Sequence, residues 1–214
     1  MRKIFTLVFC TLIASPVFAT TWMIGDDDGY GMGIPDNANH PFDGFSASYD
    51  GRTADEVAAT NGAQYTDTYS TTQGSYGPAD QTGDVATFLF EGLGNSWTEG
   101  SMWFDMADFQ ASTFGSVAVS YNGIAQNWSF NDGFPSTVVR FFDLEADVLA
   151  SINVLGSLTV EIDRNNSSDF YGFDYALLSD RVGSDTSSVP EPGTLLLLCL
   201  GLAGMVSGRR QFKS

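Results

Sequence analysis

Short runs of β-branched and aromatic residues, separated by turns rich in glycine, asparagine and proline, make up most of the chain between residues 20 and 185. The alternation is strict at 158–163, where Leu158, Val160 and Ile162 share one face of a predicted strand. This pattern predicts a domain built from strands. The other strands are predicted at 21–24, 64–69, 85–90, 96–104, 117–121, 137–142 and 170–178.

The last predicted strand, 170–178, carries large apolar residues at every second position from Tyr171 to Leu177. These residues are expected to face the core, because alternate side chains of a strand lie on one side of the sheet. Asp174 lies between them, on the other face, and is expected outside the core.

Two short helices are predicted among the strands. Thr53 followed three residues later by Glu56 indicates a capping box, so 53–59 is expected to form one helical turn. Apolar residues at four-residue spacing predict a connecting helix over 144–152. Since strands and helices do not alternate, we predict an all-β fold, an antiparallel β-sandwich, with a jelly roll as its specific topology.

Both ends of the chain have the composition of processed segments. Arg2 and Lys3 precede an apolar region, which predicts a signal peptide cleaved after Ala19 and export by the Sec machinery. Near the other end, 194–207 is free of charge and spans about 21 Å as a helix, short of a bilayer core of about 30 Å. We therefore divide the chain into a signal peptide (1–19), a β-sandwich (20–185), a linker (186–193), a membrane-spanning helix (194–208) and a basic cytoplasmic stop (209–214).

The tail has three parts in a fixed order: the tetrapeptide Val189-Pro190-Glu191-Pro192, the short apolar span, and the basic pair Arg209-Arg210. It resembles the PEP-CTERM sorting signal of Gram-negative bacteria that secrete exopolysaccharide. The resemblance implies that an exosortase in the inner membrane recognises and cleaves the tail. The protein is then expected at the cell surface, outer membrane or extracellular matrix, with only transient membrane anchoring. The alternative interpretation is a plain C-terminal membrane anchor.

The charge of the exported part is strongly negative. The whole chain has 26 acidic and 9 basic residues, for a net charge of −17. Without the processed ends, which hold Glu191 and five of the basic residues, 25 acidic and four basic residues remain, with no lysine and no cysteine. Such a domain is a poor partner for nucleic acid and anionic membranes and a good one for divalent cations. The alternative is that the acidity only keeps the protein soluble.

Catalytic motifs are scarce, and we predict that the protein is not an enzyme. His40 is the only histidine, so the chain does not supply a zinc site or a convincing catalytic triad, and no Gly-x-Ser-x-Gly motif is present. The abundant carboxylates offer many pairs for glycoside hydrolysis, but nothing in the sequence distinguishes one pair. A glycoside hydrolase therefore remains the third interpretation.

Calcium is the metal that the acidic residues favour. The sequence Asp26-Asp27-Asp28-Gly29 supplies three carboxylates on a turn, although its spacing is not that of an EF-hand loop. The segments at 24–31 and 169–178 also resemble the terminal strands of calcium-stabilised jelly-roll carbohydrate-binding modules, in which acids of the first and last strands share an ion. We therefore predict Asp26, Asp28 and Asp174 as calcium ligands; the alternative is an acidic surface turn.

Trp97 and Trp128 lie beside loop-type residues and are the candidate platforms for stacking on sugar rings. Strand aromatics more often belong to the core, which is the alternative for both. The sequence as a whole predicts an exported, calcium-stabilised, non-enzymatic component of an exopolysaccharide matrix. A carbohydrate-binding module for a specific glycan is the leading alternative.

Overall fold

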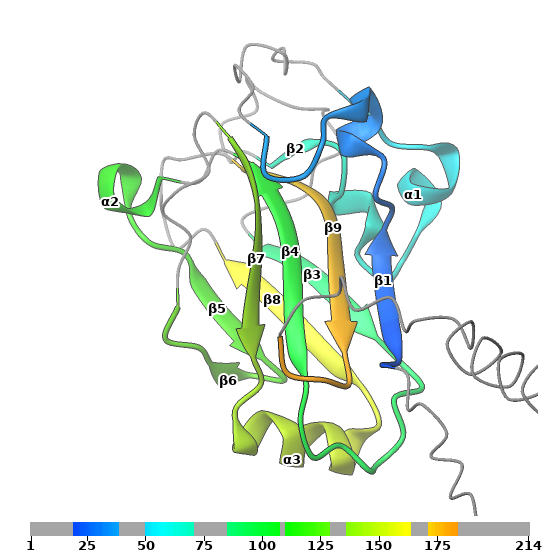
Figure 1. The fold of residues 1–214 in the computed structure, drawn as a ribbon, viewed down its shortest axis with the longest axis vertical. Helices are drawn as coiled ribbons and strands as arrows, with labels where there is room; N and C mark the ends of the chain where they lie inside the picture. The colour runs from blue at the N-terminus through cyan, green and yellow to red at the C-terminus, as the bar shows by residue number, and fades with distance from the viewer. Residues whose placement is uncertain are drawn as a thin grey trace, which may run out of the picture. The chain divides into compact units, whose positions relative to one another are not determined.

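Two antiparallel sheets form the framework of the protein (Figure 1). The computed structural model describes residues 19–38, 50–70, 85–107, 110–128, 136–163 and 171–183. Residues Thr20–Ser184 belong to one compact unit, and the two ends of the chain belong to another. The strands are β1 (Thr21–Gly25), β2 (Tyr69–Ser70), β3 (Val85–Phe90), β4 (Ser101–Ala107), β5 (Ala118–Tyr121), β6 (Ile124–Ala125), β7 (Thr137–Asp143), β8 (Leu158–Asp163) and β9 (Tyr171–Ser179).

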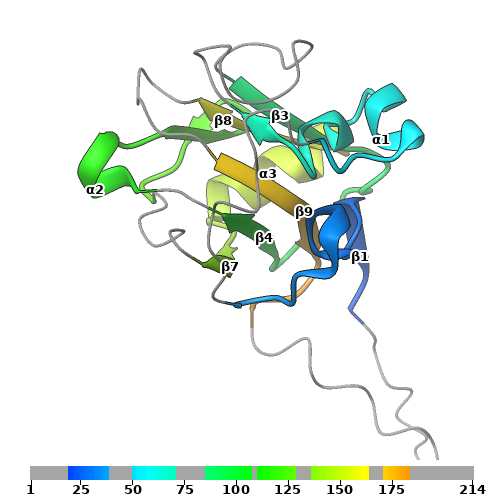
Figure 2. The same ribbon diagram turned by 90° about the horizontal axis from the view of Figure 1, so that it is seen from above.

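One sheet has the order β1-β9-β4-β7, with β2 also pairing with β9, and the other has the order β3-β8-β5-β6. All pairs of these strands are antiparallel. Seen from above, the sheets lie as two layers (Figure 2). The prediction of an antiparallel β-sandwich is therefore confirmed.

The strand pairs are nested along the chain. With β2 set aside, the first strand pairs with the last (β1·β9), the second with the second last (β3·β8), and so on inward through β4·β7 to β5·β6. The first half of the chain thus runs antiparallel to the second half. One consequence is that the loop after β1 lies beside β9, although some 145 residues separate them in sequence.

The core fills the space between the sheets. Leu158, Val160 and Ile162 of β8 are fully buried, as their alternation predicts. Aromatic rings from both sheets meet there, and Phe88 of β3 packs edge-on against Phe173 of β9 with ring centroids 5.5 Å apart. The described core is one apolar cluster of 22 buried residues, to which both sheets contribute.

The helices are short and lie at the ends of strands. They are a π-type turn η1 (Gly29–Gly33), α1 (Ala54–Ala58), a 3-10 turn η3 (Ala63–Tyr65), α2 (Ala111–Phe114) and α3 (Ala146–Leu155). The predicted capping box is present in α1, where Thr53 N–H donates to Glu56 Oε2 (2.8 Å) and Glu56 N–H donates to Thr53 Oγ1 (3.3 Å). The predicted connecting helix corresponds to α3, which buries Val148 and Ile152.

Two predicted strands are wrong in extent. Residues 64–65 end η3, 66–68 form only isolated bridges, and β2 begins at Tyr69, because Asp67 adopts a left-handed backbone with φ 52° that interrupts an extended strand. The strand predicted at 96–104 begins only at Ser101. The preceding residues form a loop, since Trp97 N–H donates to Asn153 Oδ1 (2.7 Å) of α3 and not to a neighbouring strand.

Asp174 occupies an irregular position in β9. Phe104 of β4 pairs with Ala176 and Asp105 with Tyr175, but Met106 pairs with Phe173, so Asp174 is the extra residue of a β-bulge. The bulge reverses the alternation: Phe173, Ala176 and Leu178 all belong to the apolar core. The predicted faces of this strand are therefore wrong beyond Phe173, and Asp174 itself is fully buried instead of lying on the surface.

No helix in the described part of the chain is long and apolar enough to cross a membrane. The predicted signal helix and the span at 194–208 lie outside the described residues.

Candidate metal centre

The loop that follows β1 turns sharply at glycines. Gly25, Gly29 and Gly31 have φ of 82°, 72° and 67°, a left-handed conformation that glycine adopts without steric cost. At Gly25 the chain passes so close to β9 that an added Cβ would lie 2.5 Å from the Asp174 carbonyl oxygen. The sequence thus brings three consecutive aspartates, Asp26 to Asp28, directly beside the bulge of β9.

The Asp174 side chain holds this loop in place. Its carboxylate accepts hydrogen bonds from the N–H groups of Gly29 (3.2 Å) and Tyr30 (2.7 Å). Tyr30 is fully buried, and its hydroxyl donates to Asp105 Oδ1 at 3.4 Å. The bulge therefore directs a carboxylate out of the sheet and under the loop, where it meets the other acids.

Asp67 approaches the same place from the segment that leads into β2. Its backbone is fixed, because its N–H donates to Phe173 O (2.7 Å) and its carbonyl accepts from Gly51 N–H (2.8 Å). Its side chain is fully buried, yet among the described residues no donor hydrogen-bonds to either carboxylate oxygen. A buried carboxylate without a donor is costly, so this group requires a proton or a cation.

Four carboxylates converge at this point, from Asp26, Asp28, Asp67 and Asp174. One oxygen of each lies within 4.8 Å of one oxygen of every other. The structure thus brings together all three predicted ligand residues. A second group, formed by Asp27, Asp36 and Asp174, meets the same distance limit and shares Asp174 with the first.

Sequence reasoning missed Asp67 in this cluster. The residues around it were interpreted as a short strand, in which Asp67 would have no special position. The available signal was an acid inside a polar run close to β2, but its neighbours in space depend on the pairing of that run with Gly51 and Phe173. Those pairings are long-range and leave no local pattern.

The surroundings raise the pKa of several of these acids. Burial, followed by the negative charges of Glu56, Asp174 and Asp28, raises the pKa of Asp67 to about 9. Burial also raises the pKa of Asp174 to about 6, despite its backbone hydrogen bonds. The pKa of Asp26 is raised by burial and by Asp28. In the absence of a cation, the cluster thus favours protons over negative charge.

The donor set fits a hard cation. The cluster offers carboxylate oxygens from four residues and, within the described part of the chain, neither histidine nor cysteine takes part. Calcium binds six to eight such oxygens, with backbone carbonyls and water completing the shell. Glu56 borders the cluster, but its oxygens already accept from Thr53 and Thr66, which leaves the four aspartates as the candidate ligands.

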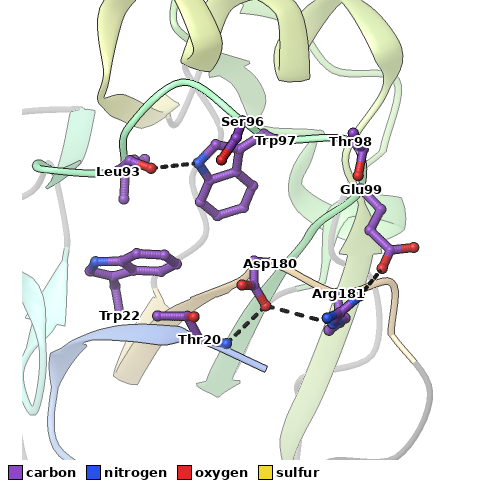
Figure 3. A pocket seen from close by; sticks show the side chains of 9 residues that line it. All are labelled: Thr20, Trp22, Leu93, Ser96, Trp97, Thr98, Glu99, Asp180 and Arg181. Atoms are coloured by element: carbon purple, nitrogen blue, oxygen red, sulfur yellow. Dashed lines mark hydrogen bonds and ion pairs between the residues drawn. The ribbon is translucent and has the colours of Figure 1, made fainter. Parts of the chain in front are cut away.

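The two tryptophans predicted as sugar platforms have different environments. Trp128 packs against the core and stacks on Phe142 with ring centroids 3.8 Å apart, so this packing gives no support to a sugar contact. Trp97 is 7% exposed and lies at the side of a groove of about 370 Å³ (Figure 3). The lone histidine, His40, lies outside the described residues, as do the residues of the sorting tetrapeptide and the basic pair.

Comparisons with known proteins identify the tail and little else. No curated protein matches the chain. A crystal structure of dimeric latent PorU from Porphyromonas gingivalis is 12% identical and covers 76% of this chain and 12% of its own, with a TM-score of 0.35, which does not establish a shared fold. The PEP-CTERM protein-sorting motif matches residues 188–211. That motif implies processing by an exosortase, export and sorting to the cell surface, and it confirms the PEP-CTERM sorting signal predicted for the tail.

Proposed function

We propose that the exported domain is a calcium-stabilised jelly roll that acts without catalysis as a structural or binding component of the exopolysaccharide matrix. The observation that carries the proposal is the buried Asp67 carboxylate, which faces three other acids and has no donor from the described residues. A calcium ion satisfies all four carboxylates at once. A proton on Asp67, hydrogen-bonded to Asp174, satisfies only that pair.

The nesting of the strand pairs supports the jelly-roll topology. In a jelly roll, a long antiparallel hairpin wraps so that its four pairs divide between two sheets. Here β1·β9 and β4·β7 lie in one sheet, and β3·β8 and β5·β6 lie in the other. The first and last strands are then neighbours, which is the arrangement that an ion between Asp26, Asp28 and Asp174 needs.

The distribution of acids supports a non-enzymatic role. The four clustered carboxylates lie under a loop with one oxygen of each within 4.8 Å of the others, and Asp67 and Asp174 are fully buried. A glycoside hydrolase instead places two carboxyl groups about 5 to 9 Å apart on either side of an accessible sugar. In the groove of Figure 3, Glu99 and Asp180 both lie beside Arg181, at 2.8 Å and 3.9 Å from its nitrogens. Their partner is this guanidinium, and the pair shows no asymmetry that assigns one acid and one base.

The test is thermal unfolding of the processed protein with calcium and with a chelator. Calcium at a hundred times its dissociation constant adds about 2.7 kcal/mol, equivalent to roughly 5–11 °C for a domain of this size. Asp26→Ala and Asp174→Ala are expected to abolish this increase. Glu91→Gln is the matched control, because Glu91 is an exposed acid outside the cluster and its substitution should keep the full increase.

An unchanged melting temperature of the parent protein on adding calcium would refute the calcium proposal. An increase that survives both aspartate substitutions would place the ion elsewhere in the protein. For the matrix role, the measurement is extraction of the host's extracellular polysaccharide. Recovery of the protein only in the polysaccharide-free fraction would contradict it.

A further inference from the structure

A groove at the other end of the β1·β9 pair carries a second set of functional groups. Thr20 and Trp22 form one side, the loop from Leu93 to Glu99 forms another, and Asp180 and Arg181 close it (Figure 3). The register places Thr21 opposite Ser179 at this end and Gly25 opposite Tyr175 at the acidic cluster. Four residues of strand, or about 13 Å, therefore separate the groove from the candidate metal centre.

Two indole rings form the apolar side of the groove. Trp22 and Trp97 have ring centroids 5.3 Å apart and planes tilted by 36°. Trp97 is fixed in position: its Nε1–H donates to Leu93 O (2.9 Å), and its backbone exchanges two hydrogen bonds with the Asn153 side chain (2.7 and 2.8 Å). Trp22 is only half-buried and packs against this rigid ring, so the aromatic surface is formed before any ligand arrives.

A row of alternating polar groups forms the other side. Thr20 N–H donates to Asp180 Oδ1 (2.8 Å), Arg181 Nε lies 3.9 Å from the same oxygen, and Arg181 Nη1 donates to Glu99 Oε1 (2.8 Å). The side chains of Glu99, Asp180 and Arg181 are 32–44% exposed, so their remaining donors and acceptors face solvent. Such fixed carboxylates and a guanidinium are suitable partners for hydroxyl groups.

The charge of the protein restricts the ligand. Arg181 is already shared between two carboxylates, and after cleavage before Thr20 the α-amino group of that residue carries a positive charge that lies against Asp180 Oδ1. The processed domain still carries 25 acidic residues against four basic side chains. An anionic polymer such as a polyuronate would be repelled by this field and would find no free cation in the groove. An uncharged polyhydroxylated ring avoids both costs.

We propose that the Trp22–Trp97 groove binds one unit of a neutral polysaccharide, with the sugar ring against Trp22 and its hydroxyls toward Glu99 and Asp180. The volume of about 370 Å³ lies in the range of small-ligand sites and suits one or two sugar rings. This inference deepens the proposed matrix role by naming the ligand class and its binding surface. It does not depend on the calcium ion, because none of the groove residues belongs to the acidic clusters.

The experiment is affinity electrophoresis of the processed protein in gels that contain dextran, galactomannan, a soluble β-glucan or alginate. At least one neutral polysaccharide is expected to retard the parent protein, and alginate is not. Trp22→Ala should weaken binding about thirtyfold, the usual effect of removing a tryptophan anchor. Trp103→Ala is the matched control, since Trp103 packs on Phe141 on the outer face of the β4–β7 pair and should leave retardation unchanged.

Glu99→Gln provides a second variant with nearly the same side-chain size. Its part-exposed carboxylate pairs with Arg181 at 2.8 Å, and replacing it is expected to weaken binding severalfold. The proposal is overturned if alginate alone retards the protein, if none of the polysaccharides does, or if Trp103→Ala and Trp22→Ala are retarded equally. If Trp22→Ala does not fold, the Glu99→Gln variant decides: retardation equal to that of the parent overturns the proposal. Thermal unfolding with calcium, measured on the same samples, reports separately on the metal centre.

Discussion

Replacing Asp67 with asparagine should stabilise the calcium-free protein, which is the opposite of the usual effect of changing a fully buried polar residue. At pH 8 without calcium, folding requires Asp67 either to keep a buried negative charge or to hold a proton. Keeping a carboxyl protonated above its unfolded pKa of about 3.9 costs about 1.4 kcal/mol per pH unit, which sets a ceiling of about 6 kcal/mol at pH 8. Asparagine has nearly the same shape and avoids this cost.

The asparagine amide also gains a partner in the cluster. Its N–H groups are donors, and the neighbouring carboxylates of Asp174 and Asp28 are acceptors within the same group of oxygens. We therefore expect Asp67→Asn to raise the calcium-free stability by at least about 2 kcal/mol, or roughly 4–8 °C in melting temperature. The same substitution removes an anionic ligand, so the increase that calcium gives the parent should largely disappear.

The assay is thermal unfolding of the parent, Asp67→Asn and Glu91→Gln at pH 8, each in chelator and in millimolar calcium. We expect Asp67→Asn to melt above the parent in chelator. Of the three proteins, it should also show the smallest increase in melting temperature when calcium is added. Glu91→Gln makes the same change in charge at an exposed position and should follow the parent under both conditions. A variant that melts below the parent in chelator and still gains the full calcium increase would refute the reasoning.

Three further outcomes are expected. Mass spectrometry of the protein from its host should find a mature N-terminus at Thr20 and no peptide from Leu195–Ser214; an intact tail at the final location would contradict exosortase processing. In chelator, the stability contributed by Asp174 and Asp67 should be complete below about pH 4. It should be lost as pH rises through their folded pKa values, about 6 for Asp174 and about 9 for Asp67, because both are raised above the unfolded value. A melting temperature that rises steadily from pH 6 to 9 in chelator would be inconsistent with these pKa values. Gly25→Ala should lower the free energy of unfolding by more than about 1 kcal/mol and weaken calcium binding. Gly25 has φ 82°, and the added Cβ would collide with the Asp174 carbonyl. An unchanged denaturant midpoint would count against this account of the loop.

Local patterns in the sequence were sufficient for features that depend on neighbouring residues. The capping box of Thr53 and Glu56 and the buried face of β8 follow from spacing alone, and both are present. The approach of the aspartate loop to β9 followed from the expectation that the first and last strands are neighbours, and β1 does pair with β9. Asp26 and Asp28 therefore lie where the sequence predicted them relative to Asp174.

Features that depend on two partners at once were not predictable in this way. The bulge at Asp174 arises because β9 pairs with β4 on one side and, on the other, with β1 and then β2. Neither partner can be identified from the alternation of β9 alone. The bulge nevertheless decides the chemistry, since without it the Asp174 carboxylate would lie on a regular face of the sheet and not under the loop.

The proposed ion has a specific advantage in an exported domain without cysteines. It connects the loop after β1, the segment before β2 and the last strand, which are far apart in the chain. A disulfide across a loop of about 100 residues contributes about 4.7 kcal/mol under all oxidising conditions, whereas calcium at a hundred times its dissociation constant contributes about 2.7 kcal/mol and only where the ion is abundant. The calcium-free cluster opposes folding through the same carboxylates that would hold the ion. With the proposed ion, the chain is least stable where calcium is scarce, before export, and gains its full stability at the cell surface, to which its sorting motif implies delivery.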